Sequence, residues 1–470
     1  MERICAQLVT TVVSIVLARI LVPDDYSVVG IVAIFFSFCS LFISSGINSA
    51  LIQKKDSDEL DYCTVFTVNM TAALMLYAVM FFSAPAISRA YEKPMLDPII
   101  KVMGLTFFVN GYKAVICAKV SSDMQFRKFF FATLIGTVTS AVIGLAMAAG
   151  GMGPWALVAQ QMTNSTIDSL FLTFTVRLRL RFRFSRSRFR RLFSYGGRIF
   201  LASCLNTIYE NCRPLIVGLK FSTTDLAFYN KGQSFPGQLN ELGNNTLSST
   251  LFPAMAKVQD DRSAVLAMTR RFMRISSFLI FPLMAGLIAV SKNFVFVLLT
   301  EKWMPIVPFM TVFAICYAFD IIQVGNLQAI KAIGRSDYIL RMEIIKKVSY
   351  FIVIFLFVMF SRSALILSFS TIVCTAIATA VNTFPNRKLI GYKYKYQLFD
   401  VLNNLIVSVV MGVAVYLIGG LIPSPFAALI VQVVSGVLIY IVLNIIIKND
   451  NLRYFLDILS SFIGRGKKVK

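Results

Sequence analysis

The feature that most constrains this chain is its succession of apolar segments, each about 20 residues long and joined by short polar loops. A helix of roughly 20 apolar residues is long enough to cross the hydrocarbon core of a bilayer. Hydrophobic residues make up 57% of the 470 residues and charged residues only 15%, which is too little polar surface for a water-soluble body. We therefore predict an all-α integral membrane protein with fourteen transmembrane helices. The predicted spans are 4–22, 28–52, 63–87, 96–118, 129–149, 152–176, 195–219, 233–256, 275–298, 306–332, 338–361, 363–383, 402–421 and 425–447.

The distribution of Lys and Arg predicts the orientation of these helices. Every second loop is rich in basic residues, and the loops between them are poor in basic residues. Loops with an excess of Lys and Arg lie on the cytoplasmic side of a membrane. Because the alternation is unbroken along the chain, the number of spans must be even. Both termini are therefore predicted to be cytoplasmic.

Several kinds of chemistry are excluded by what the sequence lacks. It has no His, and it has no G-x-x-x-x-G-K-[ST] loop that would bind and hydrolyse ATP. Its eight Cys have no C-x-x-C spacing and lie mostly inside apolar segments, so we expect neither disulfides nor a metal site. No loop is longer than about twenty residues, which leaves no room for a catalytic domain outside the membrane. We expect no cofactor, no metal and no enzymatic activity.

A basic segment, Arg177–Arg191, reads RLRLRFRFSRSRFRR and separates the sixth span from the seventh. Arg alternating with Phe is compatible with a nucleic-acid groove. Attraction to anionic lipids of the cytoplasmic leaflet, about 1 kcal/mol for each basic residue near the surface, explains the segment more simply. We predict a cytoplasmic linker that contacts anionic membrane lipids and binds no nucleic acid.

An internal repeat relates the two halves of the chain. Residues 17–30 align with residues 217–230 without a gap, and the same offset places Asn48 on Ser248. Because this offset corresponds to six helices, matching spans have the same orientation, as in transporters built from parallel repeats. The predicted organisation is a six-helix lobe at 1–176, the basic linker at 177–194, a six-helix lobe at 195–385, helices thirteen and fourteen at 386–447, and a basic cytoplasmic tail at 448–470.

Six stretches, in order along about residues 2–400, resemble the polysaccharide flippases of the Wzx type: LARILVPDDYSVVG, SALIQKKD, YENCRPLIVGLKFSTTDLAFYNKGQSFP, TLFPAMAKVQDD, LLTEKWMP and NLQAIKAIGRSD. These flippases belong to the multidrug/oligosaccharidyl-lipid/polysaccharide exporter superfamily. The resemblance implies a multi-pass protein of the bacterial plasma membrane that moves undecaprenyl-pyrophosphate-linked oligosaccharide units to the outer leaflet. It also implies alternating access without ATP, coupling to an ion such as H⁺ or Na⁺, a role in lipopolysaccharide or exopolysaccharide biosynthesis, and contact with glycan polymerase or export machinery. The alternative is a multidrug or cation antiporter of the related multidrug branch, which would prefer an acid-lined cavity.

Polar residues at membrane depth mark the candidate site, because such side chains usually face a water-filled interior. One face of the eighth span carries an acid, two amides and a hydroxyl at positions i, i+3, i+4 and i+7. The repeat gives the second span a similar polar face. Hydrogen bonding between packed helices is the alternative explanation. The candidate residues of a substrate-binding cavity are Arg213, Glu241, Asn244, Asn245, Ser248, Asn48 and Ser45.

Charged residues of three further spans complete the candidate site. Glu210 and Arg213 lie three apart in the seventh span and could simply pair with each other. Alternatively, Arg213 holds a pyrophosphate oxygen, since guanidinium matches phosphate bidentately, and Glu210 exchanges a proton or Na⁺. Asp168 in the sixth span is a second candidate for ion coupling, or it joins neighbouring helices. Lys113 in the fourth span is expected to extend toward the cytoplasmic surface.

Overall fold

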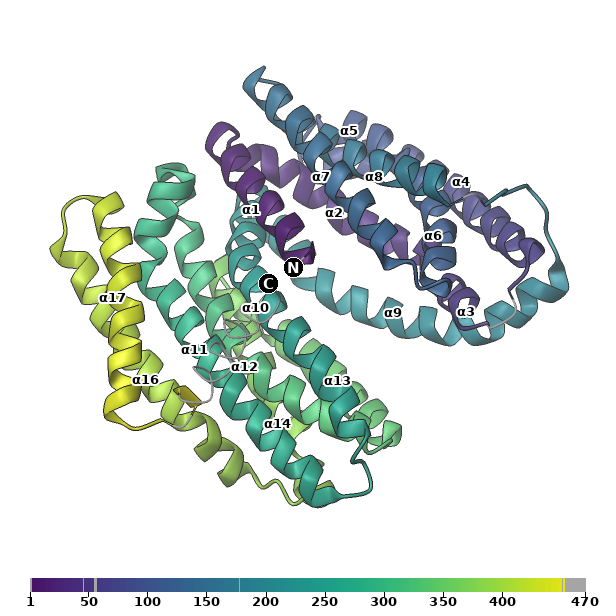
Figure 1. The fold of residues 1–470 in the computed structure, drawn as a ribbon. Helices are drawn as coiled ribbons and strands as arrows, with labels where there is room; N and C mark the ends of the chain where they lie inside the picture. The colour runs from purple at the N-terminus through teal and green to yellow at the C-terminus, as the bar shows by residue number, and fades with distance from the viewer. Residues whose placement is uncertain (1, 45, 55–56, 177, 450, 453–470) are drawn as a thin grey trace, which may run out of the picture. The chain divides into compact units, whose positions relative to one another are not determined.

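The computed structural model describes residues 2–44, 46–54, 57–176, 178–449 and 451–452, with side chains for most of them. Within these ranges the regular elements are helices (Figure 1). The chain forms two compact units, residues 1–227 and residues 228–470. The predicted division into two lobes at the basic linker, with a separate pair of C-terminal helices, stays a prediction.

The first unit contains nine helices and the beginning of a tenth within the described residues. They are α1 (Glu2–Ile20), α2 (Pro23–Ser44), α3 (Ile47–Gln53), α4 (Glu59–Ala90), α5 (Leu96–Gly104), α6 (Thr106–Ser122), α7 (Phe126–Ala149), α8 (Pro154–Thr175), α9 (Arg186–Lys220) and α10 (Thr223–Ala256), which continues into the second unit.

The second unit is formed by most of α10 and by the helices that follow it. They are α11 (Arg262–Leu299), a short 3₁₀ helix η1 (Glu301–Trp303), α12 (Ile306–Ala332), α13 (Ser336–Phe360), α14 (Ala364–Thr383), α15 (Asn386–Leu389), α16 (Tyr394–Leu421) and α17 (Pro425–Ile446).

Nine helical segments of the described chain are long and apolar enough to cross a membrane. They coincide with nine of the predicted spans. The other five predicted spans coincide with α1, α8, α9, α10 and α13 and are helical as well. The prediction of an all-helical membrane protein is therefore confirmed. The count of fourteen spans and the cytoplasmic position of both termini stay predictions.

The helix α9 begins nine residues earlier than the predicted seventh span, at Arg186 instead of residue 195. It lies against α2 and α3. The contact depends on two glycines, because a Cβ atom on Gly196 would lie 2.6 Å from the backbone carbonyl carbon of Gly46. Gly46 also has a φ of 71°, which favours glycine. The seventh span is thus packed closely against the second.

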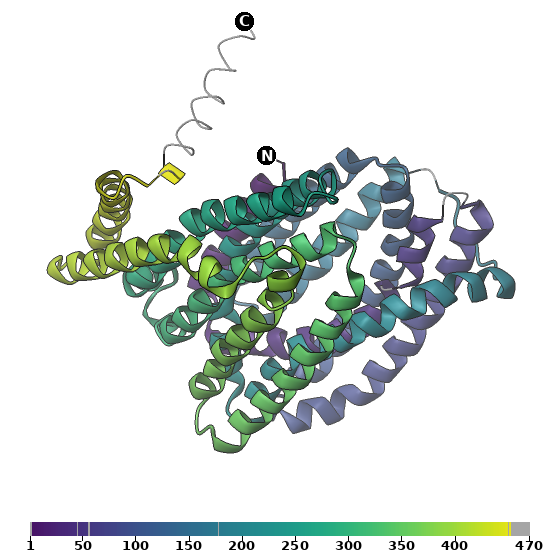
Figure 2. The same cartoon turned by 90° about the horizontal axis from the view of Figure 1, so that it is seen from below.

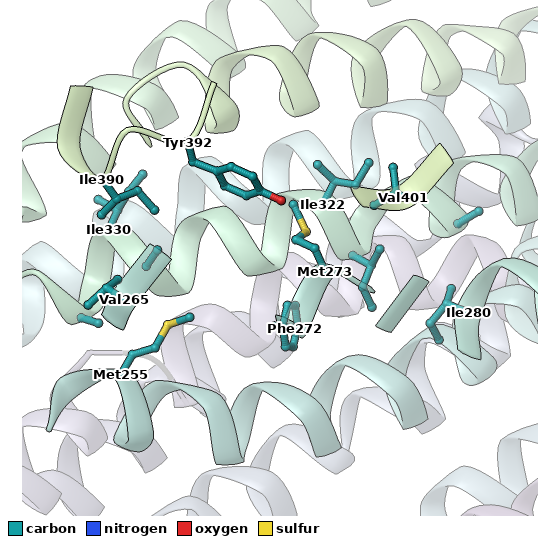
Figure 3. Packing of buried hydrophobic residues seen from close by; sticks show 14 of the residues in the cluster. Met255, Val265, Phe272, Met273, Ile280, Ile322, Ile330, Ile390, Tyr392 and Val401 are labelled. Atoms are coloured by element: carbon teal, nitrogen blue, oxygen red, sulfur yellow. The ribbon is translucent and has the colours of Figure 1, made fainter. Parts of the chain in front are cut away.

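Interlocking apolar side chains form the core of the second unit. Figure 3 shows Phe272 and Met273 of α11 beside Ile322 of α12 and Tyr392, which precedes α16. Helices in lipid associate through close packing and hydrogen bonds, since the surrounding acyl chains are equally apolar. This cluster therefore stabilises the unit mainly through the fit between its helices.

A buried carboxylate joins α16 to α11. Asp400 accepts hydrogen bonds from Arg270 Nε at 2.7 Å, from Arg274 Nη2 at 2.5 Å and from the Tyr392 hydroxyl at 2.8 Å. In addition, Asn404 donates to the Arg274 carbonyl at 2.9 Å. The helix α17 then packs on both α11 and α16 (Figure 2). The last two apolar helices are therefore an integral part of the second unit.

Candidate functional site

A cavity of about 610 Å³ lies within the first unit, between α2, α3, α5, α6 and α8. Its size falls in the range of roughly 300–1,000 Å³ that is usual for ligand sites. Phe36 and Phe107 form an apolar part of its wall, and Lys113 contributes an ammonium group. The other polar groups of the wall are hydroxyls and amides, including those of Ser37, Ser40, Asn48, Asn110, Gln161 and Ser165.

The serines of α2 illustrate what this wall can offer to a ligand. The Ser37 hydroxyl donates to the Ile34 carbonyl at 2.6 Å, and the Ser40 hydroxyl donates to the Ser37 carbonyl at 2.9 Å. The hydroxyl protons are thus used within the helix, as is common for serine in membrane helices. What such a side chain can present to the cavity is an acceptor oxygen, which suits a ligand that carries hydroxyl donors.

The cation of the cavity wall has one carboxylate partner. The Lys113 ammonium on α6 forms an ion pair with Asp168 Oδ2 on α8. The side chain of Asp168 is only 9% exposed, and its second oxygen, Oδ1, has no hydrogen-bond partner among the described residues. Lys113 is thus held by a buried carboxylate of α8, and its extension toward the cytoplasmic surface stays a prediction. The role of Asp168 in ion coupling stays a prediction.

Asn48 lies in the wall of the same cavity. Its amide donates to the Ile43 carbonyl at 2.8 Å, and its side-chain oxygen accepts a hydrogen bond from Asn69 at 3.4 Å. Asn69 also donates to the Gly111 carbonyl at 3.3 Å, so the amides connect α3, α4 and α6. Asn48 therefore lines the cavity and also takes part in hydrogen bonds between helices. Its contact with a substrate stays a prediction. Ser45 lies outside the described residues.

The two charged residues of the seventh span have separate partners on α9. Arg213 is buried, donates to the Tyr209 hydroxyl at 3.2 Å and places its guanidinium 5.2 Å from the centre of the same ring. Glu210 is exposed and accepts a hydrogen bond from Asn206 at 2.6 Å. Neither residue lines the cavity of the first unit. Phosphate binding by Arg213, ion coupling by Glu210 and a pairing between them stay predictions.

The polar face of the eighth span is described only in part. Glu241 on α10 is exposed, whereas the side chains of Asn244, Asn245 and Ser248 lie outside the described part of the structure. The residue before Glu241 is well defined, because Asn240 is buried and donates to Asp320 Oδ2 at 3.1 Å. A substrate-binding role for this face of α10 stays a prediction.

Asp320 is a candidate functional residue that the sequence analysis did not single out. It lies near the middle of α12, and its Oδ1 atom accepts a hydrogen bond from Gln323 at 3.0 Å. The Gln323 side-chain oxygen in turn accepts from Asn382 of α14 at 3.4 Å. Asn382 is 2% exposed, and its own side-chain oxygen has no partner in the described part of the chain. The sequence feature that could have identified Asp320 is a single acid at the centre of an apolar segment.

An apolar groove of about 580 Å³ runs along the second unit between α11, α16 and α17. Its wall includes Pro282 and Gly286 of α11 and Met411 of α16. Val433 and Gly436 supply part of the α17 side. The lining is almost wholly apolar, so this groove suits a hydrocarbon chain and not a sugar or a phosphate.

Comparison with known proteins places these features in context. Residues 16–308 match the family described as "Polysaccharide biosynthesis protein". An "Uncharacterized membrane protein in cps region" of Klebsiella pneumoniae is 24% identical over 329 residues, which are 68% of this chain and 67% of that protein. The lipopolysaccharide biosynthesis protein WzxC of Escherichia coli K12 is 24% identical over 323 residues, which are 66% of this chain and 63% of WzxC. The matched regions thus cover about two thirds of the length of the Klebsiella protein and slightly less of WzxC.

The fold has a close counterpart among solved structures. The lipid II flippase MurJ in its inward closed conformation superposes with a TM-score of 0.76 at 14% identity, covering 96% of this chain and 98% of MurJ. An identity this low demonstrates a shared fold only. With nine apolar helices of membrane-spanning length in the described chain, the protein is a multi-pass protein of the bacterial inner membrane.

Proposed function

Because the chain belongs to the polysaccharide biosynthesis protein family, we propose that it is a flippase for undecaprenyl-pyrophosphate-linked oligosaccharide units. It moves them from the inner to the outer leaflet of the bacterial plasma membrane by alternating access, as a transporter and not an enzyme. The observation that carries this proposal is the cavity of the first unit, whose wall combines apolar rings with hydroxyl, amide and ammonium groups. Polar residues at membrane depth usually face a water-filled interior or a polar ligand.

The cavity wall matches the chemistry of a glycan joined to a phosphate. Sugar hydroxyls can donate to the serine oxygens of α2 and can exchange hydrogen bonds with the amides of Asn110 and Gln161. Lys113 supplies a positive charge in the same wall. Since Asp168 neutralises this charge in the structure, an anionic cargo would compete with Asp168 for the ammonium group. Arg213 and the Glu241–Ser248 face of α10 are additional binding candidates.

The isoprenoid part of the cargo needs no polar shelter. We assign it to the surrounding lipid; the apolar groove of the second unit is a surface of the same chemical kind. A mainly apolar groove favours an extended hydrocarbon chain through close contact. The polar and apolar parts of the cargo would thus be bound by chemically different surfaces.

Ion coupling is assigned most readily to Asp320. Placing an acid near the middle of a membrane helix costs about 2.5–3.5 kcal/mol on insertion scales, so such a residue is retained for a function. Its carboxylate is held by neutral amides, and the side-chain oxygen of Asn382 nearby has no partner in the described structure. Oxygen ligands of this kind suit Na⁺, and protonation would equally remove the charge. Asp168 and Glu210 are the other candidates.

Deletion of the gene in its host, followed by complementation, tests the proposed function. The deletion strain should lose surface polysaccharide and accumulate lipid-linked oligosaccharide in the inner leaflet, and the wild-type chain should reverse both effects. Unchanged surface polysaccharide together with a greater sensitivity to cationic drugs would contradict the flippase function and favour a multidrug antiporter. Loss of polysaccharide without accumulation of lipid-linked units would place the chain at another step.

A further inference from the structure

The basic segment between α8 and α9 is attached to the first unit through its backbone. The N–H of Arg181 donates to the Cys63 sulfur at 3.4 Å, and the Thr67 hydroxyl donates to the Arg183 carbonyl at 3.2 Å. Both acceptor and donor side chains belong to α4. The ring of Phe182 lies 5.0 Å from that of Phe66 on the same helix. Residues 181–183 therefore have a defined path along α4 that is fixed by backbone and aromatic contacts.

The leucines of this segment pack against the core of the first unit, whereas three arginines near them are exposed. Leu178 and Leu180 pack against the apolar clusters that join α4, α6 and α8. The arginines between and after them, Arg179, Arg181 and Arg183, are exposed. Residues 181–184 are all exposed, so arginines and phenylalanines are presented together beyond the two packed leucines.

Two carboxylates at the N-terminal end of α4, the N-cap Asp58 and Asp61 in the first turn, neutralise a different part of the basic segment. Arg188, in the first turns of α9, forms ion pairs with Asp58 and with Asp61, the latter at 3.3 Å. Asp61 also pairs with Lys54 and, at 4.0 Å, with Arg191. The hydrogen bond from Arg188 holds the pKa of the Asp58 carboxyl well below its usual range. These carboxylates are therefore already matched by Arg188, Arg191 and Lys54.

Five arginines of the segment have no carboxylate partner in the described structure: Arg179, Arg181, Arg183, Arg186 and Arg190. Large aromatic rings are exposed among them. Phe182 is 73% exposed and Phe184 55% exposed, and Phe193 is 49% exposed. Exposed apolar rings are unfavourable in water, and guanidinium groups are unfavourable in hydrocarbon. They suit the headgroup layer, where phosphate meets acyl chain.

We propose that residues 179–190 form a docking surface for anionic phospholipids of the cytoplasmic leaflet. Guanidinium binds phosphate through paired hydrogen bonds, and the exposed phenylalanines insert beside the acyl chains. The carboxylates at the start of α4 restrict this role to the other arginines, since Arg188 and Arg191 are already engaged. The surface goes beyond the transport of cargo, because it ties the linker between the two predicted lobes to the composition of the membrane.

Two variants with equal loss of charge separate lipid binding from internal ion pairing. Arg181→Gln with Arg183→Gln removes two exposed arginines, and Arg188→Gln with Arg191→Gln removes the two that pair with carboxylates. The full chain is purified, and native mass spectrometry measures retention of phosphatidylglycerol against phosphatidylcholine. At about 1 kcal/mol, or fivefold, for each arginine, the first variant should retain phosphatidylglycerol roughly 25-fold less well. The second should keep most retention but unfold at a lower temperature.

A second measurement does not require those variants to fold. In the otherwise unchanged chain, Phe184→Trp places a fluorophore in the segment, and the protein is reconstituted with brominated phosphatidylglycerol or brominated phosphatidylcholine. Stronger quenching by the anionic lipid at equal content is expected. Equal quenching by both lipids, equal loss of retention in both double variants, or displacement of phosphatidylglycerol by undecaprenyl phosphate would overturn the proposal. None of these results depends on transport, so they are independent of the proposed function.

Discussion

Replacing Lys113 by Met removes the cation from the cavity wall of the first unit and takes the ion-pair partner from Asp168. The Asp168 side chain is 9% exposed, and its Oδ1 atom already has no partner among the described residues. Lys113→Met thus leaves a buried carboxylate with neither oxygen compensated. Removing one partner of a buried ion pair costs about 3–5 kcal/mol. We expect a loss near the lower limit, because the Lys113 side chain is 26% exposed and water can reach the site.

The opposite change separates the structural role of this pair from its role in binding. Asp168→Asn keeps the cation in the cavity wall and removes only its competitor, so we expect a smaller loss of stability and nearly normal transport. Lys113→Met should lower transport about ten- to a hundredfold, which corresponds to one charge-assisted contact of about 1.5–3 kcal/mol. Lys113→Arg should retain most transport.

The charge exchange, Lys113→Asp with Asp168→Lys, provides the matched control. It restores an ion pair between α6 and α8, but it places the acid in the cavity wall and the cation behind it, since Asp168 does not line the cavity. Thermal unfolding of the purified protein and transport per inserted molecule are then measured. We expect recovery of stability without recovery of transport. Recovery of both stability and transport would show that the pair is only a structural contact. It would refute the assignment of Lys113 to cargo binding.

Three further changes test other parts of the account. Arg213→Ala should lower export about ten- to a hundredfold with normal insertion, and Arg213→Lys should restore part of it; full export at normal expression would remove Arg213 from the site. Asp320→Asn should make transport insensitive to an imposed Na⁺ or proton gradient, and an unchanged response in vesicles would exclude Asp320 from coupling. Asp400→Ala leaves Arg270 and Arg274 without their shared carboxylate, but the two arginines are 38% and 48% exposed and can be solvated. We therefore expect a loss of about 1.5–3 kcal/mol in unfolding stability but unchanged transport per folded molecule; an unaltered melting temperature would contradict this.

The positions of the helices could be predicted from the sequence because membrane thickness sets the length of an apolar segment. The ends of the helices are harder to predict from the sequence. The seventh span was placed from residue 195 because polar residues precede it, yet α9 begins at Arg186. Helical hydrogen bonds join backbone groups, so a helix can continue into the cytoplasm with basic side chains around it. Apolar length therefore predicts the part inside the membrane and not the whole helix.

The candidate site could be predicted only in part, because side-chain pairing depends on how each helix is rotated. Lys113 and Asp168 were both noted in the sequence, but their contact depends on the facing sides of α6 and α8. Asp320 does not stand out in the sequence, because only one other charged or amide residue lies at i±3, i±4 or i±7 from it. Its partner Asn240 comes from α10, and Asn382 of α14 reaches the same group through Gln323, so the polar group is complete only in three dimensions.

Reconstituted transport tests the central claim most directly. The purified chain is inserted into vesicles that contain a fluorescent undecaprenyl-pyrophosphate oligosaccharide, and a glycan-cleaving enzyme added outside measures how much cargo is exposed to it. We expect cleavage to proceed past the fraction initially in the outer leaflet, without ATP, and we expect Lys113→Met to slow it while Asp168→Asn does not. Cleavage that stops at the initial outer fraction in vesicles with correctly folded wild-type protein would contradict the account.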